Sequence, residues 1–458
     1  MSREQKTTLL VAVTTAFLTT FMSSSLNLSI PNIEKEFTAG AAVVGWVVSV
    51  YMFAVSAINV PIGKVADSVG RRKILITGIA VFTVACVVSS FSSSIYMLLA
   101  MRLLQGGAGA MLFATNNAIL LSAFPPEKHG SALGKSVAAT YTGLSLGPVI
   151  GGVLNHNLGW RSIFVAAAII GVTALLLAIK GLPREERHES KHQHDYAGSA
   201  LYMAMVMALI YGLTNLTVSK YAWIILVISI MIGILFVRVE LKAKDPLIRI
   251  TMFSNDSVFT LSNLAALLNY GATFAVSYLL SIYLQLVAGY SSQTAGLILI
   301  FQPVVMAVLS PWAGKLSDRI EPLKLATAGM TICTTGLLIF IKLGEGFPLY
   351  VLIGNMVFMG VGFALFTSPN TKAIMSRVAP EDYAVANSIT ATMRNLGQSF
   401  SMAVVTIIMG VVLGSSTLQA VSKGTLIHAM RVAFVVFVVF SLVAVFMSAK
   451  CVKSNDDK

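Results

Sequence analysis

Long apolar stretches separated by short polar connections run through the whole sequence. Most are about 20 residues or longer, the length that a helix needs to cross the hydrocarbon core of a bilayer. Because the stretches do not alternate apolar and polar residues, spanning helices rather than membrane β-strands are predicted. The sequence therefore predicts an all-α polytopic membrane protein with spans at residues 8–31, 42–63, 74–94, 96–122, 133–155, 162–181, 197–217, 222–239, 257–287, 295–314, 325–343, 349–371, 385–413 and 426–449.

The two longest hydrophilic segments divide these spans into groups. Segments 182–196 and 240–256 flank spans seven and eight, which predicts two six-helix bundles with an inserted helix pair between them. Segment 182–196 has three His residues near acids; a metal site is conceivable there, but a solvated linker is the preferred interpretation. The predicted division is 1–181, 182–256, 257–449 and a cytoplasmic tail, 450–458.

The charge balance follows the expected membrane topology. Only 11% of the residues are charged, whereas soluble domains have about 25%. With the N-terminus inside, most Lys and Arg residues fall on the cytoplasmic side, so the net charge of +13 does not indicate nucleic-acid binding. Arg3 and Lys6 precede the first apolar stretch as in a signal peptide, but that stretch is too long, so an uncleaved first helix is expected. We expect a cell-membrane protein with both termini in the cytoplasm, and a monomer.

Enzymatic and metal chemistry find no support in the sequence. Cys86, Cys333 and Cys451 are far apart, so neither a disulfide framework nor a metal site is indicated. No span contains paired carboxylates, a His-Glu-x2-His run or a Ser-His-Asp set. We therefore predict no enzyme, no cofactor and no bound metal.

A charged, glycine-marked turn connects spans two and three and recurs in the second half. It reads Gly-x3-Asp-x2-Gly-Arg-Arg-Lys at 63–73, and a shorter copy, Gly-Lys-x2-Asp-Arg, occupies 314–319. The turn resembles the signature loop of the major facilitator superfamily of transporters, and the second copy suggests pseudo-repeats. The resemblance implies two bundles that rock about a central site and a cytoplasmic latch that engages in one state. The latch residues would be Gly63, Asp67, Gly70, Arg71, Arg72, Gly314, Asp318 and Arg319.

Arg102 and Arg394 are embedded in predicted spans, where a charge normally faces a bundle interior or an aqueous cavity. Arg102 precedes Gln105 and a run of small residues that resembles the family's helix-4 motif; snorkelling to the interface is the alternative. Arg394 lies in span thirteen, where carbonyl or Gln partners are the alternative to a ligand site. Together with the absence of acids in span cores, these arginines favour anionic or zwitterionic ligands.

Span five contains Gly143, Gly147, Pro148, Gly151 and Gly152. Glycines four residues apart share one helix face and permit close helix packing, and Pro148 bends the helix. Generic small-residue packing is the alternative, but the run resembles the motif of the family's antiporters. The resemblance to the fourteen-helix drug:proton antiporter branch implies export of small amphipathic compounds. The alternative is a lipid or organic-anion exporter or flippase with weak or no proton coupling.

Polar residues within the spans are candidates for the substrate cavity, although each could instead form a helix–helix hydrogen bond. In the branch that the chain resembles, helix 1 carries an acid where this sequence has Met22, or Ser23 if the register shifts by one. None of the 19 acids lies well inside a predicted span, so protons could couple only through acids at helix ends. The expected partners are a small amphipathic substrate and the lipid bilayer. The cavity candidates are Asn27, Asn116, Asn117, Asn269, Tyr270, Gln302 and Asn370.

Overall fold

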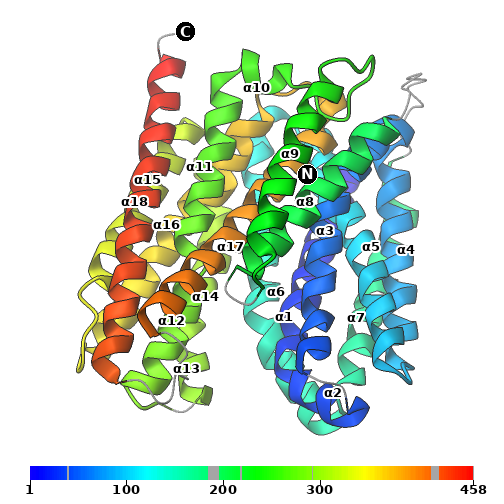
Figure 1. Cartoon of the computed structure of the whole chain (residues 1–458). Helices are drawn as coiled ribbons and strands as arrows, with labels where there is room; N and C mark the ends of the chain where they lie inside the picture. The colour runs from blue at the N-terminus through cyan, green and yellow to red at the C-terminus, as the bar shows by residue number, and fades with distance from the viewer. Residues whose placement is uncertain (39–40, 184–194, 217–218, 291, 414–421, 457–458) are drawn as a thin grey trace.

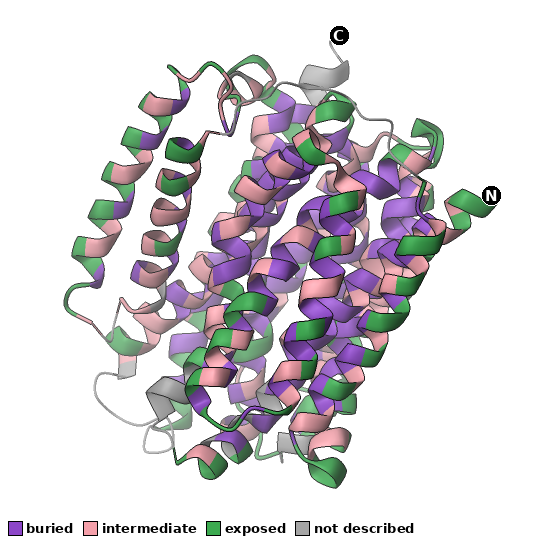
Figure 2. Ribbon diagram, turned by 90° about the vertical axis from the view of Figure 1, so that its right-hand side faces the viewer, coloured by how far each residue is buried: buried purple, intermediate pink, exposed green. Residues whose placement is uncertain are grey.

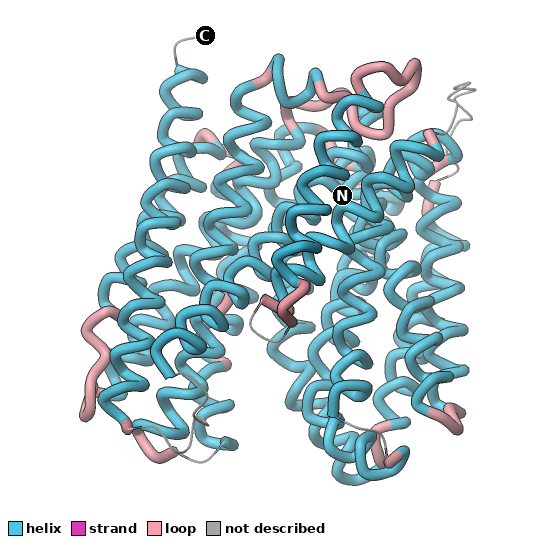
Figure 3. The backbone as a smooth tube through the Cα atoms, in the orientation of Figure 1, coloured by secondary structure: helices cyan, strands magenta, loops and turns pink. Residues whose placement is uncertain are grey.

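The computed structural model describes the chain apart from residues 39–40, 184–194, 217–218, 291, 414–421 and 457–458. Every regular element of the described part is helical, and the loops gather at the two ends of the helices (Figure 3). Fourteen described segments are long and apolar enough to span a membrane, which confirms the predicted all-α polytopic fold. The elements are α1 (Arg3–Ser25), η1 (Leu26–Ser29), α2 (Ile30–Phe37), α3 (Ala41–Val69), α4 (Arg71–Ser90), α5 (Ile95–Ala123), η2 (Pro126–Lys128), α6 (His129–Leu158), α7 (Arg161–Gly181), α8 (Tyr196–Thr214), α9 (Ala222–Glu240), α10 (Thr251–Asn255), α11 (Ser257–Thr273), α12 (Val276–Ile282), η3 (Tyr283–Val287), α13 (Ser292–Leu299), α14 (Phe301–Leu316), α15 (Pro322–Phe340), α16 (Leu349–Met375), η4 (Pro380–Asp382), α17 (Tyr383–Leu413) and α18 (Lys423–Asp456).

Two helical bundles lie side by side (Figure 1). Most contacts of α1 to α7 are with one another, as are most of those of α11 to α18, but α14 packs closely against α6 and α17 against α3 and α5. α8 and α9 form a separate antiparallel pair beside the junction, where α8 contacts α3 of the first bundle and α17 of the second. This pair stands at the edge of the molecule and is largely exposed (Figure 2). The arrangement is the expected six-plus-two-plus-six plan, although the division points of the chain stay a prediction.

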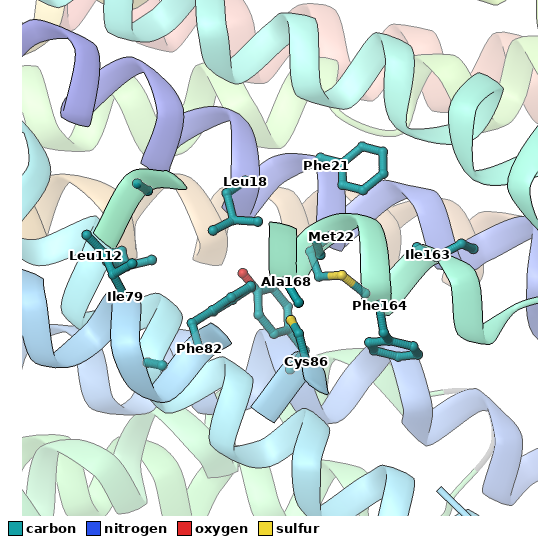
Figure 4. Packing of buried hydrophobic residues seen from close by; sticks show 14 of the residues in the cluster. Leu18, Phe21, Met22, Ile79, Phe82, Cys86, Leu112, Ile163, Phe164 and Ala168 are labelled. Carbon is teal, nitrogen blue, oxygen red and sulfur yellow. The ribbon is translucent and has the colours of Figure 1, made fainter. Parts of the chain in front are cut away.

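A packed apolar core holds the first bundle together. Phe21, Met22, Phe82 and Phe164 come from three helices, α1, α4 and α7, and are at most 1% exposed. Their side chains lie close together with the Cys86 thiol (Figure 4). The position at which the resemblance called for an acid is thus filled by a thioether packed inside the bundle.

Both chain termini lie at one end of the bundles, which we call the terminal side. Gln5 donates a hydrogen bond to the carbonyl of Ala123 at the end of α5 (3.2 Å). Near the other terminus, Cys451 packs against Val258 and Leu323, which begin α11 and α15. Figure 1 shows the bundles meeting at this side and diverging towards the other, which we call the far side.

The structure adds detail to three predicted segments. Span 8–31 is not one helix: it breaks after Ser25, and Pro31 opens the short α2. Span 257–287 agrees with the candidate span Ser257–Val287. Within it α11 and α12 are separated by two residues, and the N–H of Ala275 donates to the Ser401 hydroxyl (3.0 Å). Residues 450–456 continue α18, and Cys451 is buried there, while the cytoplasmic position of this tail stays a prediction.

Candidate functional site

Asp67 joins the two bundles at the terminal side. Its carboxylate accepts hydrogen bonds from the N–H groups of Ala384 (3.2 Å) and Val385 (3.0 Å), in the first turn of α17. Arg71 donates to the same carboxylate (2.7 Å) and also to the carbonyl of Pro380, which precedes α17. Since the first N–H groups of a helix lack partners within that helix, a carboxylate satisfies them and complements the helix dipole.

Asp318 makes the equivalent contact from the second bundle to a helix of the first. Its carboxylate accepts from the N–H groups of Gly130 (2.7 Å) and Ser131 (2.8 Å), in the first turn of α6. Lys372 provides the positive partner at 2.7 Å. Each half of the molecule therefore caps a helix of the other half with the Asp of its own motif copy, and the two contacts are related by pseudo-symmetry.

The glycine four residues before each Asp permits this close approach. A Cβ on Gly63 would lie 2.9 Å from the carbonyl oxygen of Ala384, and one on Gly314 would lie 2.8 Å from the Cα of Gly134. Both distances are too short for a side chain to fit without movement of a backbone. Because the Gly and the Asp are four residues apart in the motif, the glycine that permits close contact and the capping carboxylate are on the same face of the helix.

The other predicted latch residues have separate positions. Gly70 joins α3 to α4 with φ 115°, a backbone conformation that favours glycine. Arg72 donates to the carbonyls of Ile179 and Leu182 at the end of α7, within its own bundle. The Arg319 side chain is exposed. Asp67, Arg71 and Asp318 are therefore the charged motif residues that the structure brings to the junction.

A central cavity lies between the bundles. Arg394 alone carries a charge among the described residues that line it, and its guanidinium carbon lies 5.6 Å from the ring centre of Phe113. The lining is otherwise a mixture of hydroxyl, amide and apolar groups. It consists of Thr15, Ala16, Thr19, Leu112, Phe113, Asn116, Asn117, Ser136, Val137, Thr140, Tyr141, Ala266, Tyr270, Phe366, Thr367, Asn370, Thr371, Asn387, Thr390, Ala391 and Arg394.

Side chains cross between the bundles at this cavity. Asn117 donates to the side-chain oxygen of Asn387 (2.9 Å), and Tyr141 is hydrogen-bonded to Thr367 (3.2 Å). Asn387 is one turn from the terminal-side start of α17, whereas Arg394 is two turns deeper. The terminal side of the cavity is thus closed by hydrogen bonds as well as by the Asp67 and Asp318 contacts.

The chain was compared with known proteins. A family model described as Major Facilitator Superfamily matches residues 12–402 and 264–455. The chain belongs to the major facilitator superfamily. It is accordingly a membrane transporter for small molecules rather than an enzyme.

Named relatives have different substrates. The riboflavin transporter RibZ of Clostridioides difficile (strain 630) is 31% identical over 380 residues, 83% of each chain. The multidrug resistance protein Stp of Mycobacterium tuberculosis is 28% identical over 409 residues, 88% of this chain and 76% of that protein. The human organic anion transporter MFSD10 (TETRAN) has the same fold, with a TM-score of 0.69, 14% identity and coverage of 97% and 99% of the two chains.

In this superfamily member Arg102 lies inside the first bundle and does not line the cavity. It is fully buried, and it donates to the carbonyl of Val47 (2.8 Å) and to Gln105 (2.9 Å). Its guanidinium carbon is 4.6 Å from the ring centre of Tyr51, and Gln105 donates to Ser89 (3.0 Å). The Arg102 cluster therefore holds α3, α4 and α5 together, and its coupling role stays a prediction.

The glycine face of α6 packs against α1 of the same bundle. A Cβ on Gly143 would lie 2.8 Å from the carbonyl oxygen of Phe17, and one on Gly151 would lie 2.5 Å from that of Ser25. Gly147 lies against Ser24, whose hydroxyl donates to the carbonyl of Gly143 (3.3 Å). Pro148 and Gly152 lie in the same helix, each one position after a packed glycine and so on a different face.

The cavity candidates divide into two groups. Asn116, Asn117, Tyr270 and Asn370 line the cavity, although Asn116 also donates to the carbonyl of Ala12 within its own bundle (3.2 Å). Asn269 and Gln302 are buried outside the lining. Asn27 is in η1, and its side chain lies outside the described residues.

Residues that sequence reasoning missed form much of the lining. Asn387, Ala391 and Arg394 are spaced i, i+4 and i+7 on α17 and so share a face. That spacing from a predicted cavity arginine could have identified Asn387. The described residues contain no group of His, Cys, Asp and Glu that could hold a metal, while the His-rich stretch 184–194 lies outside them.

On the far side, α2 is tied to the start of α7. Glu36 accepts hydrogen bonds from the indole of Trp160 (2.7 Å) and from Arg161 (2.8 Å). Burial alone would raise the pKa of the Glu36 carboxyl, but these donors and the charge of Arg161 outweigh it and hold that pKa below its ordinary value.

Proposed function

We propose that this protein is a secondary active exporter of small amphipathic compounds that works by alternating access. The supporting observation is a central cavity between two bundles that is closed at the terminal side by the paired contacts of Asp67 and Asp318. We place the terminal side in the cytoplasm of a cell-membrane protein and expect a monomer. The described conformation then has its closed end towards the cytoplasm and its substrate cavity towards the outside.

The transport cycle follows from the pseudo-symmetry of the closed end. Opening towards the cytoplasm requires both carboxylates to leave the first turns of α17 and α6. The N–H groups released in this way become accessible to water, which replaces the lost hydrogen bonds. The closed and open states therefore differ by a few hydrogen bonds and ion pairs, as a reversible switch requires.

Substrates with an anionic or electron-rich group are favoured by Arg394. An arginine that lacks a lining carboxylate repels cations and offers several donors to a carboxylate, phosphate or carbonyl group. Tyr270 and Phe113 add aromatic faces for a planar ring system. An exporter of organic anions is therefore the more specific form of the proposal, in keeping with the name of one solved structure.

Transport by purified protein in proteoliposomes tests the proposal. Flux of riboflavin, of a carboxylate dye and of a cationic dye would be measured with the pH gradient and the membrane potential imposed separately. We expect Arg394→Gln to lower carboxylate flux by about tenfold or more, the loss of one charge-assisted hydrogen bond. The control is Arg238→Gln, because Arg238 is exposed at the end of α9.

The outcomes separate the two levels of the proposal. Equal carboxylate flux in Arg394→Gln and wild type would contradict the anion preference while leaving an exporter. Non-saturating flux of every compound would contradict a carrier mechanism altogether.

A further inference from the structure

Two carboxyl groups face each other where the inserted helices meet the terminal side. Asp195 caps α8, and its Oδ1 accepts from the N–H of Gly198 (2.6 Å). Glu240 ends α9, is 2% exposed, and accepts from the N–H of Ile248 through Oε2 (3.0 Å). One oxygen of each carboxyl is therefore used by the backbone.

The other two oxygens have no donor within the described part of the chain. Asp195 Oδ2 and Glu240 Oε1 are both buried and receive no N–H or O–H group. Both lie against Gly198, whose missing side chain leaves the space, since a Cβ there would meet both oxygens. The Cβ position of Gly198 would be 2.0 Å from Glu240 Oε1 and 2.5 Å from Asp195 Oδ2, so the two oxygens are at most about 4.5 Å apart.

Two ionised carboxylates can only accept hydrogen bonds, so they would repel each other at this distance. One proton between them removes a charge and provides the missing donor for both oxygens. We infer that Asp195 and Glu240 share one proton and form a proton-binding site outside the central cavity. This inference stands apart from the substrate proposal, because it rests on different residues.

The loop that follows Glu240 is held by that residue and crosses the junction of the bundles. Ile248, which donates to Glu240, lies in the loop 241–250 after α9. In that loop Asp245 pairs with Lys64 of α3 (2.7 Å), and Arg249 pairs with Asp382 just before α17 (3.0 Å). We call residues 241–250 the strap, because one ion pair ties it to each bundle beside the Asp67 contact.

Release of the shared proton to the terminal-side solution leaves two facing carboxylates. Their repulsion displaces Glu240 from the N–H of Ile248 and loosens the strap. The closed terminal side then loses the support of both ion pairs, so a high pH on that side favours its opening. This provides a proton-sensitive element in a chain whose described cavity lining has no carboxylate.

The other charged and titratable groups near the Asp195–Glu240 pair and the strap already have partners or are exposed. In α3, Lys64 is paired with the strap and Asp67 with Arg71. In α8, Tyr202 donates to Thr392 of α17 (3.0 Å). The exposed cations at the end of α9 and in the strap are Arg238, Lys242 and Lys244.

The test measures the distance between the bundles in the full-length protein. Spin labels would be attached at Lys73→Cys on α4 and Lys324→Cys on α15, which are exposed, while the three native cysteines are buried. Distance distributions in lipid nanodiscs would be recorded over about four pH units around neutrality. We expect the ratio of open to closed molecules to rise with pH, by at most about tenfold per unit for one released proton.

Variants assign the effect to the pair. Glu240→Gln keeps an oxygen for Ile248 and gives Asp195 a permanent N–H donor, so it should stay closed at every pH. Asp195→Asn should behave alike and provides a second test if the first variant misfolds. Glu345→Gln, an exposed far-side acid, should keep the wild-type response. The infrared band of a protonated carboxyl should be present in wild type and absent in both pair variants.

Two results would overturn the inference. One is a pH-independent ratio in wild type, and the other is an unchanged pH midpoint in both amide variants. Neither result depends on transport, so a failure here is distinguishable from a failure of the exporter proposal.

Discussion

Asp67 and Asp318 are 251 residues apart in the chain and make the same contact with opposite bundles. Each carboxylate accepts from two consecutive N–H groups in the first turn of a helix across the junction. Each also pairs with a basic residue of its own bundle at 2.7 Å. The two contacts therefore close one side of the molecule as a matched pair.

Asp67→Asn should slow transport more than it weakens substrate binding. The amide offers only one acceptor oxygen and no charge, so the closed terminal side loses ~1–3 kcal/mol. Because the cavity lining is untouched, substrate affinity of the detergent-solubilised protein should change less than turnover. Asp318→Asn is the matched variant and should have a similar effect. A large loss of affinity with unchanged conformational populations would argue against the latch.

The matched pair could be predicted from the sequence only in part. The repeated Gly-x3-Asp spacing identified the residues, and the resemblance placed them at a junction between bundles. The spacing did not indicate that each carboxylate caps a helix. The capped N–H groups of Ala384 and Gly130 are 317 and 188 residues away from Asp67 and Asp318 in the sequence, and only packing makes them neighbours. The proximity of Asp195 and Glu240 was missed for the same reason: 45 residues separate two acids that the α8–α9 hairpin brings together.

The glycine face of α6 should tolerate substitution unequally. In Gly147→Ala the new methyl group meets the Ser24 hydroxyl, which can rotate away, whereas in Gly151→Ala it meets the backbone of Ser25, which cannot. Gly151→Ala should therefore cost ~1–3 kcal/mol of stability and Gly147→Ala less, while Gly147→Leu should be far worse than Gly147→Ala. Thermal unfolding in detergent and transport measure this order. Equal stability and activity of all three would mean that the face does not pack as described.

Arg102→Ala should impair both transport and thermal stability. The truncation removes a fully buried guanidinium and leaves the Val47 carbonyl and Gln105 without their donor. Leaving buried polar groups unpaired costs about 1–3 kcal/mol each. The conservative Arg102→Lys separates the roles, since Lys keeps the charge but cannot bridge both acceptors in the same geometry. If Arg102→Ala transports substrate as well as wild type, the predicted coupling role of Arg102 is wrong.

Acidification should loosen the far-side tie between α2 and α7. The pKa of Glu36 is lowered in the folded protein, so its contribution to stability is present above the ordinary carboxyl pKa and is lost as the pH falls through the folded value. Hydrogen exchange of α2 should therefore increase in acid, and Glu36→Gln should show that increased exchange already at neutral pH. Exchange in Glu36→Gln equal to wild type at both pH values would contradict this assignment.

Proton coupling is where this chain departs from the branch that it resembles, and helix 1 provides the sharpest test. Met22 is fully buried in the bundle core, so Met22→Asp would place a carboxyl among aromatic rings. This variant should destabilise the protein without coupling transport to protons. Ser23 is half-buried and lies one turn from Thr19, which lines the cavity, so Ser23→Asp should place a titratable group near the substrate.

A pH gradient of one unit provides ~1.4 kcal/mol per proton, which only a titratable site in the pathway can use. Ser23→Asp should therefore increase substrate-induced proton release in vesicles, above all for cations that a carboxylate can pair with. Wild type should respond to the pH gradient weakly, through acids at helix ends such as Asp67 and Glu240. Strong proton antiport by wild type that survives the amide variants of Asp67, Asp318 and Glu240 would contradict this account, because no carboxylate in the described cavity lining could then carry the proton.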